Sequence, residues 1–376
     1  MTSGDAHGDD RAACVSCLRR SWLLAQLGGP LDCNCRADGR LIDLLALGDD
    51  ELTKALAGRR LSALRSRLAN LQPDELARVD GIAEICRHDR RYPRGLRALG
   101  VAPMLFVAGE LRRLVRLTTA PVVAIVGTGR ATDYGLEIAG DLARGLAASG
   151  VTVAGELADG IARAALIGAL EGGGAAVSVL GGGVDVGAPA RSRSLLAEVK
   201  HGGVAVSELP CETSPRRWAA AAATRIVAAL AAVTVVVEAD DSSRELAGAR
   251  IAKALGRTVA AVPGRVSSRA SSGSHALLRA GASLVAGPGD VLDLLCDAER
   301  PAQESRDRQA GLDARLRAVL ESVGAGIDTP QKLTANGEDA GEVLHALSEL
   351  ELRGLLARGD GGRYVARSAV GRLVVR

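Results

Sequence analysis

The sequence predicts an α/β fold built on an extended, Rossmann-like, doubly wound and mostly parallel sheet. Short apolar runs of strand length alternate with amphipathic stretches of helix length from residue 122 to residue 287. Strands that are apolar on both faces are typical of a parallel sheet covered by helices on both sides. Glycine-rich turns follow several of these runs, as they do where such strands end beside a bound anion. A helical N-terminal region and a C-terminal winged helix complete the predicted architecture.

Residues 1–80 predict short helices in front of the sheet. Apolar positions recur there at three- and four-residue spacing, and glycine or proline breaks separate the periodic stretches. These stretches are 17–29, 40–56 and 59–71. The next segment, 84–109, predicts a loop followed by one short strand.

From Val122 onward the pattern alternates between strand and helix, as in βαβ units. The predicted strands are 122–127, 151–155, 175–183, 203–208, 232–239, 258–264 and 282–287. The predicted helices between them are 134–150, 160–173, 216–230, 244–256 and 274–281.

Composition divides the chain into four parts. The helical region 1–80 is similar to SAM or helix-hairpin-helix domains, and a Rossmann-like core covers 81–298. Residues 299–311 are polar and show no period, which predicts a linker. Residues 312–376 contain three helical stretches and then two strand-like stretches across an Asp-Gly-Gly turn. That order is typical of a winged helix.

The charge of the chain is weakly positive and is carried almost entirely by arginine. The net charge is +3, and 43 of the 47 basic residues are arginine, so nearly every phosphate contact would come from a guanidinium. Aromatic residues make up only 2%, which leaves few rings on which bases could stack. No apolar window reaches the roughly 18 residues of a membrane span. The acidic N-terminus lacks a signal-peptide pattern, so we expect a cytoplasmic protein without membrane contact.

The turn after the first core strand has the composition of a phosphate-binding loop. It reads Gly127-Thr128-Gly129 and is followed by the cation Arg130. A full dinucleotide fingerprint would require Gly or Ala at the position of Thr132, so only half of that fingerprint is present. Glu156, after the next strand, could then bind a ribose. The alternative is a glycine turn that only packs a helix against a strand.

Arginines recur in the other loops that follow core strands. The loop 180–194 contributes Arg191 and Arg193, and the helix after the fourth core strand contributes Arg216, Arg217 and Arg225. Because parallel strands end at the same edge of a sheet, these guanidiniums would line one pocket. Each arginine taken singly is equally consistent with a solvated surface position.

Four of the seven cysteines form two closely spaced pairs, Cys14-x-x-Cys17 and Cys33-x-Cys35. Four thiolates with this spacing could bind one structural zinc ion. Ordinary half-buried cysteines are the alternative, because the first pair begins an amphipathic helix. No catalytic arrangement emerges, since the five histidines are dispersed and form no pattern with acidic residues or nucleophiles.

Residues 80–376 resemble the DprA/Smf family of bacterial DNA-processing proteins. The resemblance rests on the lead-in 86–109, on the paired strand-loop units of 122–174, and on five shorter stretches that follow in the family's order. These stretches are "SVLGGGVDV", "VSELP", "VVVEA", "VAAVPG" and "SGSHALLRAGASLV". The resemblance implies a protein that binds single-stranded DNA, forms a homodimer and helps to load RecA recombinase during natural transformation. It implies no cofactor and no enzymatic activity.

Carried onto this sequence, the family's basic pocket gives a set of expected contacts with DNA phosphates. The set comprises Gly127, Thr128, Arg130, Gly160, Arg191, Arg193 and Arg225. Three positions depart from the family pattern: Gly129 stands where the family has arginine, Asp159 replaces another arginine, and Thr224 replaces asparagine. Because each lost cation removes a phosphate contact, these changes would weaken binding and flatten its dependence on salt.

Two other functions are compatible with the sequence. A Rossmann protein that senses or processes nucleotides would use the glycine turn for a phosphate and Glu156 for a ribose. A winged-helix interaction protein would use 312–376 for binding and the core as a scaffold.

Overall fold

The structure of the 376-residue chain is a computed structural model. It describes residues 11–34, 40–71, 79–186, 192–241, 244–298, 312–324, 329–334, 339–353, 355–358 and 362–366. These residues divide into two compact units, Met1–Leu295 and Cys296–Arg376. No helix within the described ranges is both long enough and apolar enough to cross a membrane.

The first unit is organised around one mixed, mostly parallel sheet. Among the described residues the sheet has ten strands in the order β1-β2-β3-β7-β6-β5-β4-β8-β9-β10. The strands β4 to β10 run parallel to one another, and β3 runs antiparallel to both of its neighbours, β2 and β7. Their bounds are Arg11–Ala12 (β1), Ile82–Ile85 (β2), Leu105–Ala108 (β3), Val122–Val126 (β4), Thr152–Glu156 (β5), Ala176–Val179 (β6), Val204–Ser207 (β7), Val233–Val236 (β8), Thr258–Ala261 (β9) and Ser283–Leu284 (β10).

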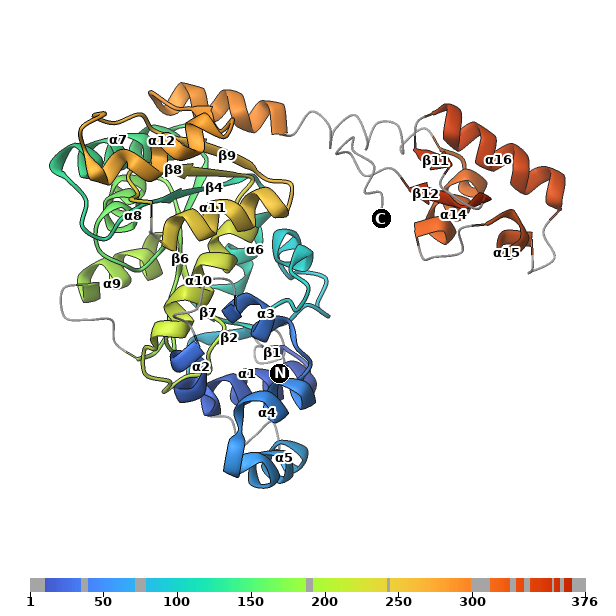
Figure 1. The fold of residues 1–376 in the computed structure, drawn as a ribbon, viewed down its shortest axis with the longest axis horizontal. Coiled ribbons are helices and arrows are strands. Elements are labelled where there is room, and N and C mark those ends of the chain that lie inside the picture. Colours follow the sequence, from blue (N-terminus) through green and yellow to red (C-terminus); the bar gives the residue numbers. More distant parts are fainter. Residues whose placement is uncertain are drawn as a thin grey trace, which may run out of the picture. The chain divides into compact units, whose positions relative to one another are not determined.

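Helices cover both faces of this sheet, which confirms the doubly wound Rossmann-like fold (Figure 1). One apolar cluster joins the sheet to α7 (Asp133–Ala148), α8 (Ile161–Glu171) and α9 (Arg193–Gly202). A second cluster, on the opposite face, joins it to α6 (Leu111–Thr119), α10 (Arg217–Leu230) and α11 (Arg244–Ala254). The helix α12 (Ser272–Arg279) packs partly buried leucines against this second cluster. Strands such as β4 and β8 are buried along their whole length, because each contributes side chains to both clusters.

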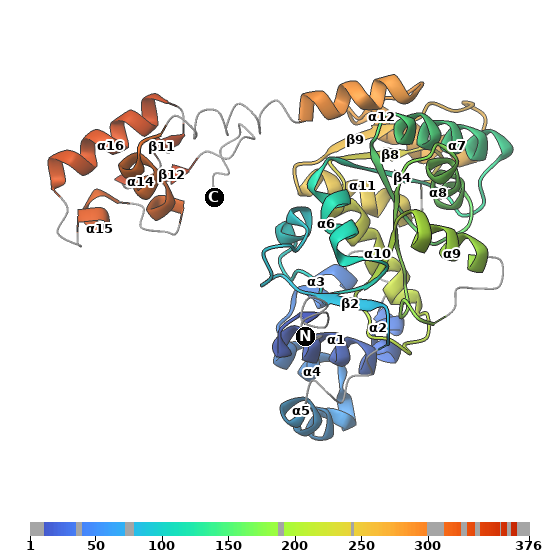
Figure 2. The ribbon, with the colours of Figure 1, turned by 180° about the vertical axis from the view of Figure 1, so that it is seen from behind.

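The N-terminal helices pack on α10 at the β1–β2 end of the first unit (Figures 1 and 2). Their leucines share one apolar cluster with Leu209, Trp218, Ala219 and Ala222. Trp218 is fully buried there, so it is a core residue. The bounds are Val15–Gln26 (α1), Gly28–Asn34 (α2), Arg40–Ala46 (α3), Asp49–Leu56 (α4) and Leu61–Asn70 (α5).

Several elements differ from those expected from the sequence. The stretch 40–56 forms two helices because Gly48, with extended backbone, ends the first and caps the second. The expected single strand of 84–109 is two antiparallel strands, β2 and β3, and β1 and α6 were not expected. Helix α9, which follows a glycine-rich loop, was also not expected.

The second unit has its own apolar core. Leu316, Val319, Leu347, Leu350 and Tyr364 are among its buried residues. Its elements are Ala314–Gly324 (α14), Pro330–Thr334 (α15), Ala340–Leu352 (α16), Leu356–Arg358 (β11) and Tyr364–Ala366 (β12). The strands β11 and β12 pair antiparallel. The winged-helix assignment stays a prediction, and the expected linker 299–311 lies outside the described residues.

Candidate nucleic-acid interface

The strand order reverses at β4, which creates a topological switch point. Along the chain β4 is followed by β5 on one side, whereas β8 pairs with β4 on the other side. Loops that leave the carboxyl ends of β4 and β8 therefore diverge to opposite faces of the sheet. A crevice outside the strand ends at such a point is where ligands of open α/β sheets bind.

The glycine turn after β4 is held between the loops that follow β5 and β8. The amide of Thr128 donates to the carbonyl oxygen of Glu238 at 2.7 Å, and the carbonyl oxygen of Thr128 accepts from the amide of Ile161 at 3.3 Å. A Cβ atom on Gly127 would lie 2.6 Å from both the Glu238 carbonyl oxygen and the Ile161 side chain. Gly127 is therefore required where the three loops meet.

Gly160 is required for a second reason. Its φ of 74° lies in the left-handed region that side chains disfavour. A Cβ atom there would also overlap the carbonyl oxygen of Thr128 and would lie 2.8 Å from the Cα atom of Gly129. Gly129 itself is less constrained, because an added Cβ atom would lie 3.7 Å from the Asp159 carbonyl oxygen, an ordinary contact distance.

The N-terminus of α7 is occupied by a carboxylate of the protein itself. Glu238, 2% exposed, accepts a hydrogen bond from the Thr132 amide at 2.9 Å and one from the Thr132 hydroxyl at 2.6 Å. The Thr132 hydroxyl also caps the helix by accepting from the Gly135 amide. Because a helix N-terminus attracts one anion strongly, Glu238 takes the position that a cofactor phosphate would occupy.

The N-terminus of α10 is capped in the same way. Asp32, on α2, accepts a hydrogen bond from the Trp218 amide at 2.9 Å. The Arg216 guanidinium lies 3.7 Å from the same carboxylate. This arrangement uses Arg216 to hold the N-terminal helices on α10, whereas Arg217 is exposed.

Exposed arginines remain at the ends of β4 and β6. Arg130 is exposed, and within the described residues its guanidinium makes no hydrogen bond or ion pair. Arg193, the first residue of α9, is also exposed. Arg191 lies outside the described residues. Because β4 and β6 are parallel strands separated only by β5, the segments that lead from them to Arg130 and Arg193 leave the sheet at the same edge.

Arg225 lies in the interior. Its Nη2 atom is 2.6 Å from Oε2 of Glu208, and the two side chains are only 6% and 4% exposed. The pair lines a cavity with Cys17, Ser21 and Met104. We therefore remove Arg225 from the expected phosphate contacts, because its guanidinium is already bound to a buried carboxylate.

Glu156 and Thr224, which are 68 residues apart in the chain, contact each other. The Thr224 hydroxyl donates to Oε1 of Glu156 at 2.6 Å, and Thr224 is 5% exposed. Position 224, where the family pattern has asparagine, thus lies in the interior. The Thr224 side chain there orients Glu156, and the difference from the family pattern does not remove a surface contact.

The structure adds candidates on the far side of the switch point. Tyr134, in the first turn of α7, is 44% exposed, and its hydroxyl donates to the Pro263 carbonyl oxygen at 2.9 Å. The loop after β9 exposes Arg265, Val266 and Arg269. Their placement beside the switch point depends on β9 and α7 packing next to β8 and β4, which the sequence pattern does not show.

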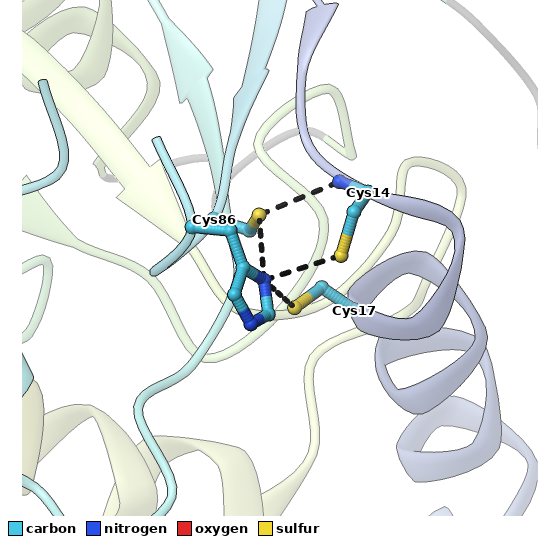
Figure 3. Close-up of side chains that lie close together, drawn as sticks. Cys14, Cys17 and Cys86 are labelled. Atoms are coloured by element: carbon cyan, nitrogen blue, oxygen red, sulfur yellow. Dashed lines mark hydrogen bonds between the residues drawn. The ribbon is translucent and has the colours of Figure 1, made fainter. Parts of the chain in front are cut away.

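The structure describes three of the four expected zinc ligands, and two of these three, Cys14 and Cys17, come together. Cys14 and Cys17 form a cluster with Cys86 and His88 (Figure 3). Cys33 is exposed on α2 and is not part of the cluster, and residue 35 lies outside the described residues. Burial raises the pKa of the Cys14 thiol, but hydrogen bonds from Ser16, Cys17 and Cys86 outweigh it and bring the pKa to about 6. Burial, together with the neighbouring Cys14 and Cys86, raises the pKa of Cys17.

Comparisons with known proteins concern the family and the fold. The sequence model of a family described as DNA recombination-mediator protein A matches residues 83–296. A Mycobacterium tuberculosis protein with the provisional name DNA processing protein DprA is 37% identical over 143 residues. Those residues are 38% of this chain and 36% of that relative, so the match spans about a third of the relative's length.

Two solved structures share the fold. The X-ray structure of DNA processing protein A from Streptococcus pneumoniae is 26% identical, with a TM-score of 0.59, and covers 75% of this chain and 98% of that one. A Helicobacter pylori structure, whose subject is the single-stranded DNA binding mode of DNA processing protein A, is 24% identical. Its TM-score is 0.51, and it covers 57% of this chain and 96% of that one.

Proposed function

The chain belongs to the DNA recombination-mediator protein A family, as its resemblance to the DprA/Smf family indicated, and from this premise we propose that it binds single-stranded DNA. The binding surface is the carboxyl edge of the sheet. One observation carries the proposal: the exposed guanidinium of Arg130 follows the glycine turn at the switch point without an acidic partner among the described residues. In this surface Gly127, Thr128 and Gly160 shape the backbone.

The remaining cations extend the surface along the strand ends. Arg193 lies on one side of Arg130, and Arg265 and Arg269 follow β9 on the other side. We also propose Arg191 as a phosphate contact, because the sequence places it in the loop between β6 and α9. Guanidiniums that contact phosphates carry no base preference, so we expect binding that is independent of DNA sequence.

The nucleotide-binding alternative is disfavoured by the capping carboxylates. Glu238 holds the N-terminus of α7 and Asp32 holds that of α10, so a nucleotide phosphate would have to displace a buried or tethered anion. Glu156, the candidate ribose ligand, already accepts the Thr224 hydroxyl. A strand of DNA meets no such obstacle, because its phosphates need only the exposed arginines.

The C-terminal unit is a poor candidate for DNA binding. Three of the exposed arginines in this unit are already engaged by acidic side chains of its third helix, α16: Arg315 pairs with Glu342, Arg353 with Glu349 and Arg358 with Glu351. Leu352 on the same helix is 89% exposed. We propose that this unit contacts protein.

The family resemblance supports three further parts of the proposal. We propose that the protein forms a homodimer, that it assists the loading of RecA recombinase onto bound strands in transformation or recombination, and that it acts without a cofactor and without catalysing a reaction. Light scattering on the eluting protein tests the dimer. Recombinase filament assembly on strands coated with a single-strand-binding protein, with and without this chain, tests the loading.

Fluorescence anisotropy of a labelled single-stranded oligonucleotide, titrated at several salt concentrations, tests the central proposal. Arg130→Ala should weaken binding several-fold and make the slope of log K against log salt less negative by about 0.7 for the lost phosphate contact. The matched control is Arg144→Ala, an exposed arginine at the other end of α7 that pairs with Asp141 and Glu171. Equal behaviour of the two variants would overturn the proposed surface.

A second measurement separates the alternatives. ATP or NAD should leave the melting temperature of the protein unchanged, whereas oligonucleotide should raise it. Removal of residues 312–376 should preserve the affinity for single strands. Loss of all DNA binding in that truncated protein, with the first unit still folded, would instead locate the DNA contacts in the C-terminal unit.

A further inference from the structure

We propose that Cys14, Cys17, Cys86 and His88 bind one zinc ion, which fastens helix α1 to the end of strand β2. One potential ligand atom from each residue lies within 4.8 Å of the other three. The cluster lies outside the proposed DNA surface, at the β1–β2 end of the sheet. It is therefore independent of the proposed function.

The distances within the cluster fit a tetrahedral zinc site. With Zn–S of about 2.3 Å and Zn–N of about 2.0–2.1 Å, sulfur and nitrogen ligands lie about 3.6 Å apart. The Nδ1 atom of His88 is 3.3 Å from Sγ of Cys14, 3.6 Å from Sγ of Cys17 and 3.6 Å from Sγ of Cys86. All three distances are close to the roughly 3.6 Å expected between sulfur and nitrogen ligands of a tetrahedral zinc ion.

Sheet topology brings the two halves of the cluster together. Strand β1 runs parallel to β2, with Ala12 opposite Ile85. The segments that follow the two strands therefore leave the sheet at the same edge and in the same direction. Cys14 is two residues beyond Ala12, and Cys86 directly follows Ile85. The amide of Cys14 donates to Sγ of Cys86 at 3.4 Å, a contact that suits a sulfur carrying negative charge.

Helix α1 supplies the first pair of ligands with favourable electrostatics. Cys14 is its N-cap residue and Cys17 lies in its first turn. The positive end of the helix dipole favours a thiolate at Cys14. The zinc ligand is the thiolate, and at Cys17 the charge of the bound ion itself would stabilise that form. The Ser16 hydroxyl lies 3.1 Å from Sγ of Cys14 and can donate to that thiolate as a further support.

The ligand set indicates a structural ion. Three thiolates and one imidazole fill all four tetrahedral positions, and catalytic zinc sites keep one position open for water. The imidazole of His88, an exposed residue, would bind through Nδ1 and carry its proton on Nε2. Cys86 is 1% exposed and anchors the cluster to the core.

The site would close a long loop of the chain. Cys14 and Cys86 are 72 residues apart, and all five N-terminal helices lie between them. A cross-link that closes a long loop removes much conformational freedom from the unfolded chain. Because Cys17 and Ser21 on α1 also line the cavity of Glu208 and Arg225, the ion would hold α1 against that buried pair.

Metal analysis of the purified full-length protein, after incubation with zinc and removal of the excess, tests the proposal. We expect one zinc per chain in the wild type and a loss of most of it in Cys86→Ser and in His88→Ala. The matched controls are Cys33→Ser and Cys296→Ser, which alter exposed cysteines outside the cluster and should retain the ion. Equal zinc content in Cys86→Ser and the wild type, or none in the wild type, would overturn the proposal.

Alkylation of the native wild type supplies a readout that does not require the variants to fold. With zinc bound, Cys14, Cys17 and Cys86 should be protected while Cys33 and Cys296 react, and a chelator should expose Cys14 and Cys17 and lower the melting temperature. Burial and the nearby Asp185 raise the pKa of Cys211 to about 12, so this thiol should stay slow throughout. Equal alkylation of Cys14 and Cys17 with and without chelator, or a Cys14–Cys17 disulfide in protein kept under reductant, would refute a zinc site.

Discussion

Arg225 and Glu208 form an ion pair of 2.6 Å inside the protein, with 6% and 4% of their side chains exposed. The pair joins α10 to the loop after β7. The same loop is held from the N-terminal side, because the Ser21 hydroxyl donates to the Glu208 carbonyl oxygen at 2.5 Å. An arginine that the sequence suggested for DNA contact thus contributes to the core.

The buried pair predicts a large effect on stability and little effect on binding. Arg225→Ala should lower the free energy of unfolding by about 3–5 kcal/mol, because it leaves the Glu208 carboxylate buried without its partner. Urea denaturation measures this loss. The double variant Arg225→Met, Glu208→Leu should recover most of it, since neither charge then remains. Folded Arg225→Ala protein that loses affinity for single strands while its stability is unchanged would restore Arg225 as a phosphate contact.

The loop contact at Gly160 predicts that two neighbouring glycines differ sharply in tolerance. Gly160→Ala should destabilise the protein by at least about 2 kcal/mol, because it combines a left-handed backbone with steric overlap. Gly129→Ala should change the stability by no more than about 0.5 kcal/mol, since its Cβ atom meets only an ordinary contact. Thermal unfolding of the two variants side by side measures both. Similar melting temperatures would show that the loops rearrange freely.

The free space beside Gly129 also permits a substitution that raises the affinity for DNA. Gly129→Arg introduces a cation beside Arg130 without a clash at the Cβ atom, so it should raise the affinity for single strands several-fold. It should also make the salt slope more negative by about 0.7, the value for one added phosphate contact. Gly129→Gln, similar in length but neutral, is the control. A gain that is equal in both variants would indicate that charge is not the cause.

We expect Tyr134 to contact DNA by stacking on a base and not through charge. Tyr134 is 44% exposed beside the basic edge of the sheet, where a base could stack on its ring. Tyr134→Ala should therefore weaken binding by about 1–3 kcal/mol while leaving the salt slope unchanged. Tyr134→Phe loses only the hydrogen bond to Pro263 and should bind nearly as the wild type does. A change of slope in Tyr134→Ala would argue for disturbed arginines and against stacking.

The order of strands and helices in the core was predictable because it depends on local pattern. Runs such as 122–126 are apolar at every position, and only a strand covered on both faces needs that. Helices of the same region show an amphipathic period along the length of the element. The two-residue β1 is too short to show any pattern, and α9 was missed although its ten residues form a helix behind a glycine-rich loop.

The location of the candidate site was predictable in outline. Parallel strands place the loops after β4, β5 and β6 at one edge whatever the side chains are, so Arg130 and Gly160 could be assigned to that edge. The capping role of Glu238 could not, because it depends on the pairing of β4 with β8. Asp32 and Trp218 are similarly joined only by the packing of α2 against α10.

The sequence by itself determined that the chain forms a doubly wound sheet of this family, because hydrophobic period and turn composition are properties of neighbouring residues. Tertiary structure decided which side chains meet. It turned Arg225 inward, since the N-terminal helices cover the face of α10 that would otherwise reach solvent. It also united Cys14 and Cys17 with Cys86 and His88, which no spacing rule connects across 72 residues. Such contacts depend on how whole elements pack, and packing energy depends on surfaces that become neighbours only in the folded chain.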